Sequence, residues 1–168
     1  MVTIIQPEQI EEVWKSMIML DEQESMSIVD KLEEEQPALL VYLMTPPEEF
    51  TEPEAENLMY AGIVVWRTFD KYGPKLRVIT EDEIYEIEDA NIEVMEKLEG
   101  ESAGDGIAMI ERMLDRYPQP HVLASIAEIL LVEDEELDPE EDISDQARGT
   151  MMLILKTFLD AMIKAEIQ

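Results

Sequence analysis

Apolar residues recur along most of this chain at the spacing of an α-helix. After Pro7 they follow at positions i, i+3, i+4, i+7 and i+8, which form one face of a helix: Ile10, Val13, Trp14, Met17 and Ile18. Proline suits the first helical position, where its missing N–H group has no intrahelical partner. The chain is therefore predicted to open with an amphipathic helix from Pro7 to Ile18.

Three more helices are predicted in the first half. One spans residues 21–36, with Asp21 as N-cap and apolar residues Met26, Val29 and Leu32. Residues 38–44 are apolar on all sides, which predicts that they are buried all round whatever their conformation. By itself this run could be a strand, but between helical neighbours we expect a short helix. A proline-rich acidic loop over residues 45–57 leads into a central helix over residues 58–69. Gly73 and Pro74 end that helix.

The second half repeats this order of elements. Residues 80–83 have the pattern of a capping box, in which Thr80 and Glu83 satisfy each other's free backbone N–H groups. The helix that they begin ends at Gly100. Further helices are predicted over residues 105–117, within 119–132 and over 145–165. An acidic segment over residues 133–142 separates the last two.

Two short motifs recur in the same order in both halves. Ile5–Ile10 and Ile79–Ile84 share the pattern I-x-x-acid-x-I, and a Gln-Pro pair occurs at 36–37 and at 119–120. We therefore predict an all-α fold of about eight helices, built as two tandem and similar four-helix units. The units are residues 1–73 and 74–168, packed as one globular domain. The alternative is that any amphipathic chain of eight helices can look self-similar.

The charge of the chain is extreme. Forty-one acidic residues against twelve basic ones give a net charge of −29, while 46% of the residues are hydrophobic, as in a folded protein. This charge repels nucleic acids and anionic membranes, whose phosphates are also negative. It attracts basic proteins. No direct contact with nucleic acid or membrane is expected.

The composition also limits chemistry and location. There is no cysteine, which excludes disulfides, zinc–thiolate sites and cysteine nucleophiles. The N-terminal residues lack the basic and apolar regions of a secretory signal. Apolar runs reach only about eight residues, against roughly 20 for a membrane span. We expect a cytoplasmic protein.

The candidate partner-binding residues lie in two acidic segments, the first over residues 45–57 and the second over residues 133–142. If the two halves are stacked repeats, both segments emerge at the same edge and form one negative stripe. A solvated connector is the alternative interpretation of both. The residues concerned are Glu48, Glu49, Glu52, Glu54, Glu56, Glu133, Asp134, Glu135, Glu136, Asp138, Glu140, Glu141 and Asp142.

No catalytic or metal-binding motif is complete. In a calcium loop starting at Asp134, the sixth position would be Pro139, where a glycine is needed for the turn. A di-iron site needs Glu-x-x-His, but the only histidine, His121, follows Pro118 at that spacing. The glycine-rich residues 102–106 lack the Gly-Lys-Ser/Thr ending of a P-loop. We expect no cofactor, no metal and no enzymatic activity.

The twelve methionines allow two interpretations. Methionine fills irregular cores, and it also lines adaptable binding grooves. Core packing is the favoured interpretation. The alternative is an exposed methionine-lined groove between the two units, flanked by acids, that accepts a basic amphipathic helix.

These observations predict a non-enzymatic interaction module, either an adaptor, a chaperone or an inhibitor, for a basic protein or basic amphipathic helix. Two alternatives stay open. The acidity could be an adaptation to high salt around a fold of unrelated role, or the acids could mimic the phosphates of a nucleic acid. The sequence is also compatible with a homo-oligomer.

Overall fold

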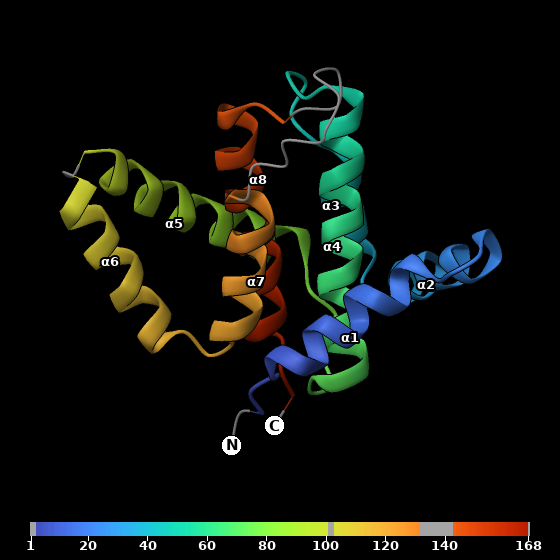
Figure 1. The fold of residues 1–168 in the computed structure, drawn as a ribbon. Coiled ribbons are helices and arrows are strands. Elements are labelled where there is room, and N and C mark those ends of the chain that lie inside the picture. The colour runs from blue at the N-terminus through green and yellow to red at the C-terminus, as the bar shows by residue number, and fades with distance from the viewer. Residues whose placement is uncertain (1–2, 101–102, 132–142, 168) are drawn as a thin grey trace.

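The computed structural model describes residues 3–100, 103–131 and 143–167. These residues form eight helices and no strand (Figure 1). The all-α class and the number of helices are therefore as predicted. The helices are α1 (Pro7–Ile18), α2 (Glu22–Glu35), α3 (Pro37–Met44), α4 (Glu52–Tyr72), α5 (Glu81–Glu99), α6 (Ala103–Arg116), α7 (Pro120–Leu131) and α8 (Asp145–Lys164).

Side-chain caps fix the start of several helices. A side-chain oxygen accepts a hydrogen bond from the backbone N–H of the residue three positions later at Asp21, Thr51, Thr80 and Ser144. The cap at Thr51 makes α4 begin at Glu52 rather than at the predicted Leu58. Its first turn is polar, so the apolar spacing alone does not reveal it.

Helices α4 and α8 form the centre of the molecule. They lie side by side and run in the same direction, from the top to the bottom of the view in Figure 1. Phe69 of α4 and Phe158 of α8 are fully buried in one hydrophobic core that draws residues from both halves. Each such side chain contributes about 1.5–3 kcal/mol through burial. Gly62 lets α3 approach α4 closely, because an added Cβ would lie 2.5 Å from Leu43.

The helices of the two halves make matching contacts. Within the first half α4 packs on α1 and α3, and within the second half α8 packs on α5 and α7. Between the halves, α1 packs on α7, α3 packs on α5, and α4 packs on α8. An internal duplication would produce such pairs. The duplication, and the boundaries 1–73 and 74–168, remain predictions.

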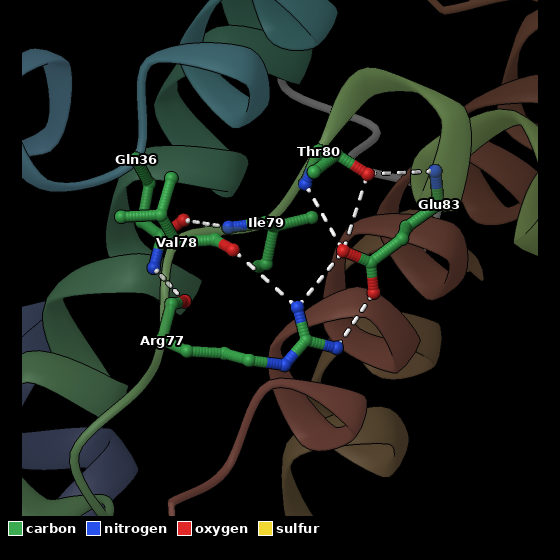
Figure 2. Close-up of polar contacts among 6 residues, drawn as sticks. All are labelled: Gln36, Arg77, Val78, Ile79, Thr80 and Glu83. Carbon is green, nitrogen blue, oxygen red and sulfur yellow. Dashed lines mark hydrogen bonds and ion pairs between the residues drawn. The ribbon is translucent and has the colours of Figure 1, made fainter.

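The two Gln-Pro motifs hold the segments that precede α1 and α5. Gln36 donates to the Arg77 carbonyl (2.8 Å) and accepts from the Ile79 N–H (2.9 Å), as Figure 2 shows. Gln119 makes the same pair of bonds to the Thr3 carbonyl (2.7 Å) and the Ile5 N–H (3.0 Å). Each glutamine thus binds the entry segment of the other half.

An ion pair completes the junction at the start of α5. The Arg77 guanidinium binds both oxygens of Glu83, at 2.8 and 2.6 Å, and Glu83 also accepts from the Thr80 N–H (Figure 2). On its other side, the Arg77 N–H donates to the carbonyl of Ala165 near the C-terminus. The segment between α4 and α5 is therefore held by both halves.

Candidate functional site

A groove lies where the two halves meet, between α3, α5 and α8. It has a volume of about 490 Å³. We call it the junction groove, and its lining residues are Pro37, Ala38, Val41, Tyr42, Thr45, Pro47, Glu81, Ile84, Tyr85, Glu88, Thr150, Leu153 and Ile154. The volume lies in the range of small binding pockets. Most of the lining is apolar. Covering it with apolar groups of a ligand or partner would therefore lower the free energy by removing apolar surface from water.

Helix α3 leaves apolar side chains exposed beside this groove. Leu39, Leu40 and Leu43 enter the core, but Val41 and Met44 are 61% and 63% exposed. The prediction that residues 38–44 are buried all round is therefore wrong. A helix has more faces than its neighbours cover, and the packing of α3 in the described part of the chain is mainly on α2, α4 and α5.

Tyrosines and carboxylates supply the polar part of the groove. The Tyr42 hydroxyl donates to Glu88 at 2.5 Å, so that α3 and α5 are joined across the groove. Burial raises the pKa of Tyr42, and the bond to Glu88 raises it further. The charge of Glu81 raises the pKa of Tyr85, with a smaller effect from burial. Both tyrosines are thus held neutral beside negative groups.

The first acidic segment adjoins this groove. Glu48 and Glu49 are exposed and directly follow Pro47, which lines the groove. Glu52 and Glu56 are exposed in the first turns of α4. Four of the five predicted partner-binding residues of this segment therefore face solvent.

Glu54 has a different environment. It is buried, and its carboxylate accepts from the Thr51 N–H in its own helix and from the N–H and hydroxyl of Ser144 at the start of α8. Burial raises the pKa of Glu54, but the bonds from Thr51 and Ser144 outweigh it and the pKa is lowered. The carboxylate lies at the N-termini of two helices, where negative charge is favourable.

The bond between Glu54 and Ser144 also brings two distant parts of the chain together. The first acidic segment includes the first turn of α4, and Ser144 lies two positions after Asp142, the last residue of the second acidic segment. The predicted residues of that second segment, Glu133, Asp134, Glu135, Glu136, Asp138, Glu140, Glu141 and Asp142, lie outside the described residues.

Comparisons of the chain with protein-family models, with curated proteins and with solved structures find no match.

No cluster of metal-ligating side chains occurs in the described part of the chain. His121 is the second residue of α7 and is half-buried. In the same described part, no helix has the length and hydropathy needed to cross a membrane.

The methionines divide between core and surface. Met151 and Met162 are buried in α8, while Met19, directly after α1, and Met26 of α2 are exposed. Three others line a second hollow, which lies within the second half instead of between the halves. This second hollow and the junction groove are therefore separate features, although Leu153 of α8 lines both. No methionine is among the described lining residues of the junction groove.

Sequence reasoning missed the residues that shape the groove. Glu81 and Glu88 were two acids among forty-one, and Tyr42 lay within an apolar run. The spacing of Glu81, Tyr85 and Glu88 at i, i+4 and i+7 places them on one face of α5 and could have indicated a shared surface.

Proposed function

We propose that this chain is a non-enzymatic interaction protein that binds a basic amphipathic segment of a partner protein in the junction groove. One observation supports this most. The groove is apolar, and the charged residues in its described lining are both carboxylates, Glu81 and Glu88. Such a surface suits a helix with an apolar face bordered by lysine or arginine.

Recognition would divide into two contributions. The net charge of −29 attracts a basic partner from a distance and raises the rate of association at low salt. Burial of the exposed side chains of Val41 and Tyr85 then supplies affinity. Aromatic residues often dominate the binding free energy of such interfaces.

The acidic segments extend the proposed surface. Glu48 and Glu49 directly follow Pro47 of the groove lining, and Ser144, which binds Glu54, lies two positions after the second acidic segment in the sequence. We propose the exposed Glu48, Glu49, Glu52 and Glu56, together with the acids of the second segment, as contacts for basic residues outside the apolar part of the partner. In this role the chain would act on its partner as an adaptor, a chaperone or an inhibitor.

The test uses two designed helical peptides of equal length, one of Leu and Lys and one of Leu and Glu. Isothermal titration calorimetry measures their affinity at about 0.02 M and about 0.3 M salt. The Leu–Lys peptide is expected to bind one site and the Leu–Glu peptide to fail. Raising the salt should weaken binding, because the Debye length falls from roughly 20 Å to below 8 Å.

Variants locate the binding site. Glu81→Gln with Glu88→Gln should lower the affinity for the Leu–Lys peptide roughly twofold to thirtyfold at low salt. This range follows from about 0.2–1 kcal/mol for each of the two exposed ion pairs that are lost. Glu33→Gln with Glu34→Gln is the matched control, since it removes the same charge from exposed positions of α2. Val41→Ala with Tyr85→Ala should weaken binding at both salt concentrations. Equal losses in the groove and control variants would contradict the proposed site.

Capture from a lysate of the source organism then addresses the natural partner. The bait is the wild type, beside variants with the groove or the acidic segments neutralised. The expected result is a basic protein that wild type retains in stoichiometric amount and the groove variant loses.

A further inference from the structure

The two carboxylates of the junction groove have a fixed spacing along α5. Glu81 is the first residue of α5, and Glu88 follows seven positions later. This spacing is about two helical turns, or about 10.5 Å along the axis. Tyr85 lies between them, and all three residues line the groove. Positions i, i+4 and i+7 share one face of a helix, so the two carboxylates border the groove in one row.

Neither carboxylate is neutralised by a cation of the described chain. The described lining of the groove contains no lysine or arginine, and neither Glu81 nor Glu88 forms an ion pair with a described residue. Glu81 is exposed. Glu88 is half-buried, and its Oε2 accepts from the Tyr42 hydroxyl, whereas its Oε1 accepts from no described residue. Each carboxylate therefore has an oxygen for a cation of a partner.

Two contacts fix the walls of the groove. Gln36, which caps the start of α3, accepts from the N–H of Ile79, one residue before the cap of α5 (Figure 2). Further along both helices, Tyr42 of α3 donates to Glu88 of α5 at 2.5 Å. The separation of the carboxylates and their place beside α3 are thus set before a partner binds, which lowers the entropic cost of binding.

The contact at Gln36 also places the N-termini of α3 and α5 at one end of the groove. Pro37 and Glu81 are the first residues of these helices, and both line the groove. Helix N-termini carry partial positive charge, and the C-terminus of a bound helix carries partial negative charge. A helix that lies antiparallel to α5 has its C-terminal end beside Glu81, which is the favourable orientation.

We propose that the partner segment is a helix of at least two turns that lies antiparallel to α5 and carries basic residues seven positions apart. This inference rests on the proposed function, since it takes the groove as the site for a basic helix. The earlier basic residue pairs with Glu88, and the later one pairs with Glu81. Apolar residues three and four positions after the first basic residue lie between the two pairs and cover the exposed ring of Tyr85. The spacings match because both helices rise by about 1.5 Å per residue.

The test compares two helical peptides of identical composition, each with two lysines and with leucines at the same positions on an otherwise neutral helix. In one peptide the lysines are seven positions apart. In the other they are five positions apart, which turns the second lysine about 140° away from the first. Isothermal titration calorimetry at about 0.02 M salt measures both. The first peptide is expected to bind at least about threefold more tightly, because it forms both ion pairs.

The outcomes separate this inference from the proposed function. Equal affinities of the two peptides would overturn the spacing, and so would failure of both while the Leu–Lys peptide binds. Failure of all three peptides would contradict the proposed function, and the spacing with it.

Double-mutant cycles between peptide and protein then identify the pairs. Replacing the earlier lysine by glutamine should reduce the effect of Glu88→Gln at least about twofold, and replacing the later lysine should do the same for Glu81→Gln. Glutamine at position 88 keeps an oxygen that accepts from Tyr42, so the wall of the groove is preserved. Glu86→Gln is the matched control, since Glu86 is exposed on α5 outside the described lining and should couple to neither lysine. Coupling of the opposite pairs would overturn the antiparallel orientation, and equal coupling of each lysine to both glutamates would overturn the register.

Discussion

Glu83 shows how one carboxylate can serve two purposes. It caps the first turn of α5 and binds Arg77 through both oxygens. The bond to Arg77 is the largest influence that lowers the pKa of Glu83, to about 2. A lowered folded-state pKa means that the contribution to stability is present above the unfolded value of about 4.5. It is lost as the pH falls toward 2.

We therefore expect Glu83→Gln to lower the free energy of unfolding by about 1 kcal/mol at pH 7. The difference from wild type should shrink below pH 4.5 and approach zero near pH 2. Urea denaturation at several pH values measures it. Glu86→Gln removes the same charge from an exposed position of α5 and should show no such pH-dependent loss.

Glu166 is the opposite case. One of its carboxylate oxygens is buried and has no hydrogen-bond partner among the described residues. Burial raises the pKa of Glu166, so the folded state favours the protonated form. Ionisation of Glu166 therefore costs stability, and this cost fades as the pH falls and the carboxyl binds a proton.

Glu166→Gln and Glu166→Met should each raise the free energy of unfolding at pH 7, by up to about 1 kcal/mol. The gain from Gln should diminish as the pH falls and the wild-type carboxyl binds a proton. Thermal denaturation at pH 7 and pH 4 tests this. An equal gain in stability from Glu166→Gln at both pH values would show that the charge of Glu166 is not what destabilises the wild type.

At the scale of the elements, the hydrogen bonds of Gln36 and Gln119 hold the segments before α5 and α1, and each glutamine thereby joins its own half to the other half. Gln36 and Gln119 are almost fully buried, and each satisfies one buried N–H and one carbonyl of an extended segment. Such segments have no helix or sheet to satisfy their backbone groups. The side-chain amide supplies both the donor and the acceptor that they need.

Gln36→Ala and Gln119→Ala should each lower the free energy of unfolding by about 1–3 kcal/mol, since each leaves a buried N–H unpaired. If the halves are equivalent, the two losses should be similar. Gln23→Ala, at an exposed position of α2, should change stability by less than about 0.5 kcal/mol. Urea denaturation measures all three. A loss at one glutamine alone would argue against equivalent roles.

At the scale of the whole molecule, charge repulsion opposes folding. A net charge of −29 on 168 residues raises the energy of the compact state. Salt relieves this repulsion, because the Debye length falls from about 30 Å at 0.01 M to about 8 Å at 0.15 M. Beyond that range, little repulsion is left to screen.

The melting temperature of an acidic binding protein should therefore rise between 0.01 and 0.15 M NaCl and then level off. A protein adapted to high salt should continue to gain stability up to molar salt. Differential scanning calorimetry over this range separates these interpretations. A continued rise would favour salt adaptation as the origin of the acidity.

The sequence by itself determined the helices, because helix formation depends on neighbours within a few positions. The periodicity after Pro7 and the capping pair Thr80 and Glu83 each predicted an element that the structure contains. The net charge also follows from composition alone. The start of α4 was missed because its capping box precedes a first turn without an apolar face.

Only the tertiary structure decided which surfaces those helices leave open. Val41 and Leu43 are both apolar and two positions apart, yet one is exposed and the other buried, because α4 approaches one face of α3 at Gly62. Glu54 is buried because α8 begins beside it, ninety positions later in the chain. Exposure, burial and grooves depend on contacts between distant segments. A local pattern carries no information about which segments meet.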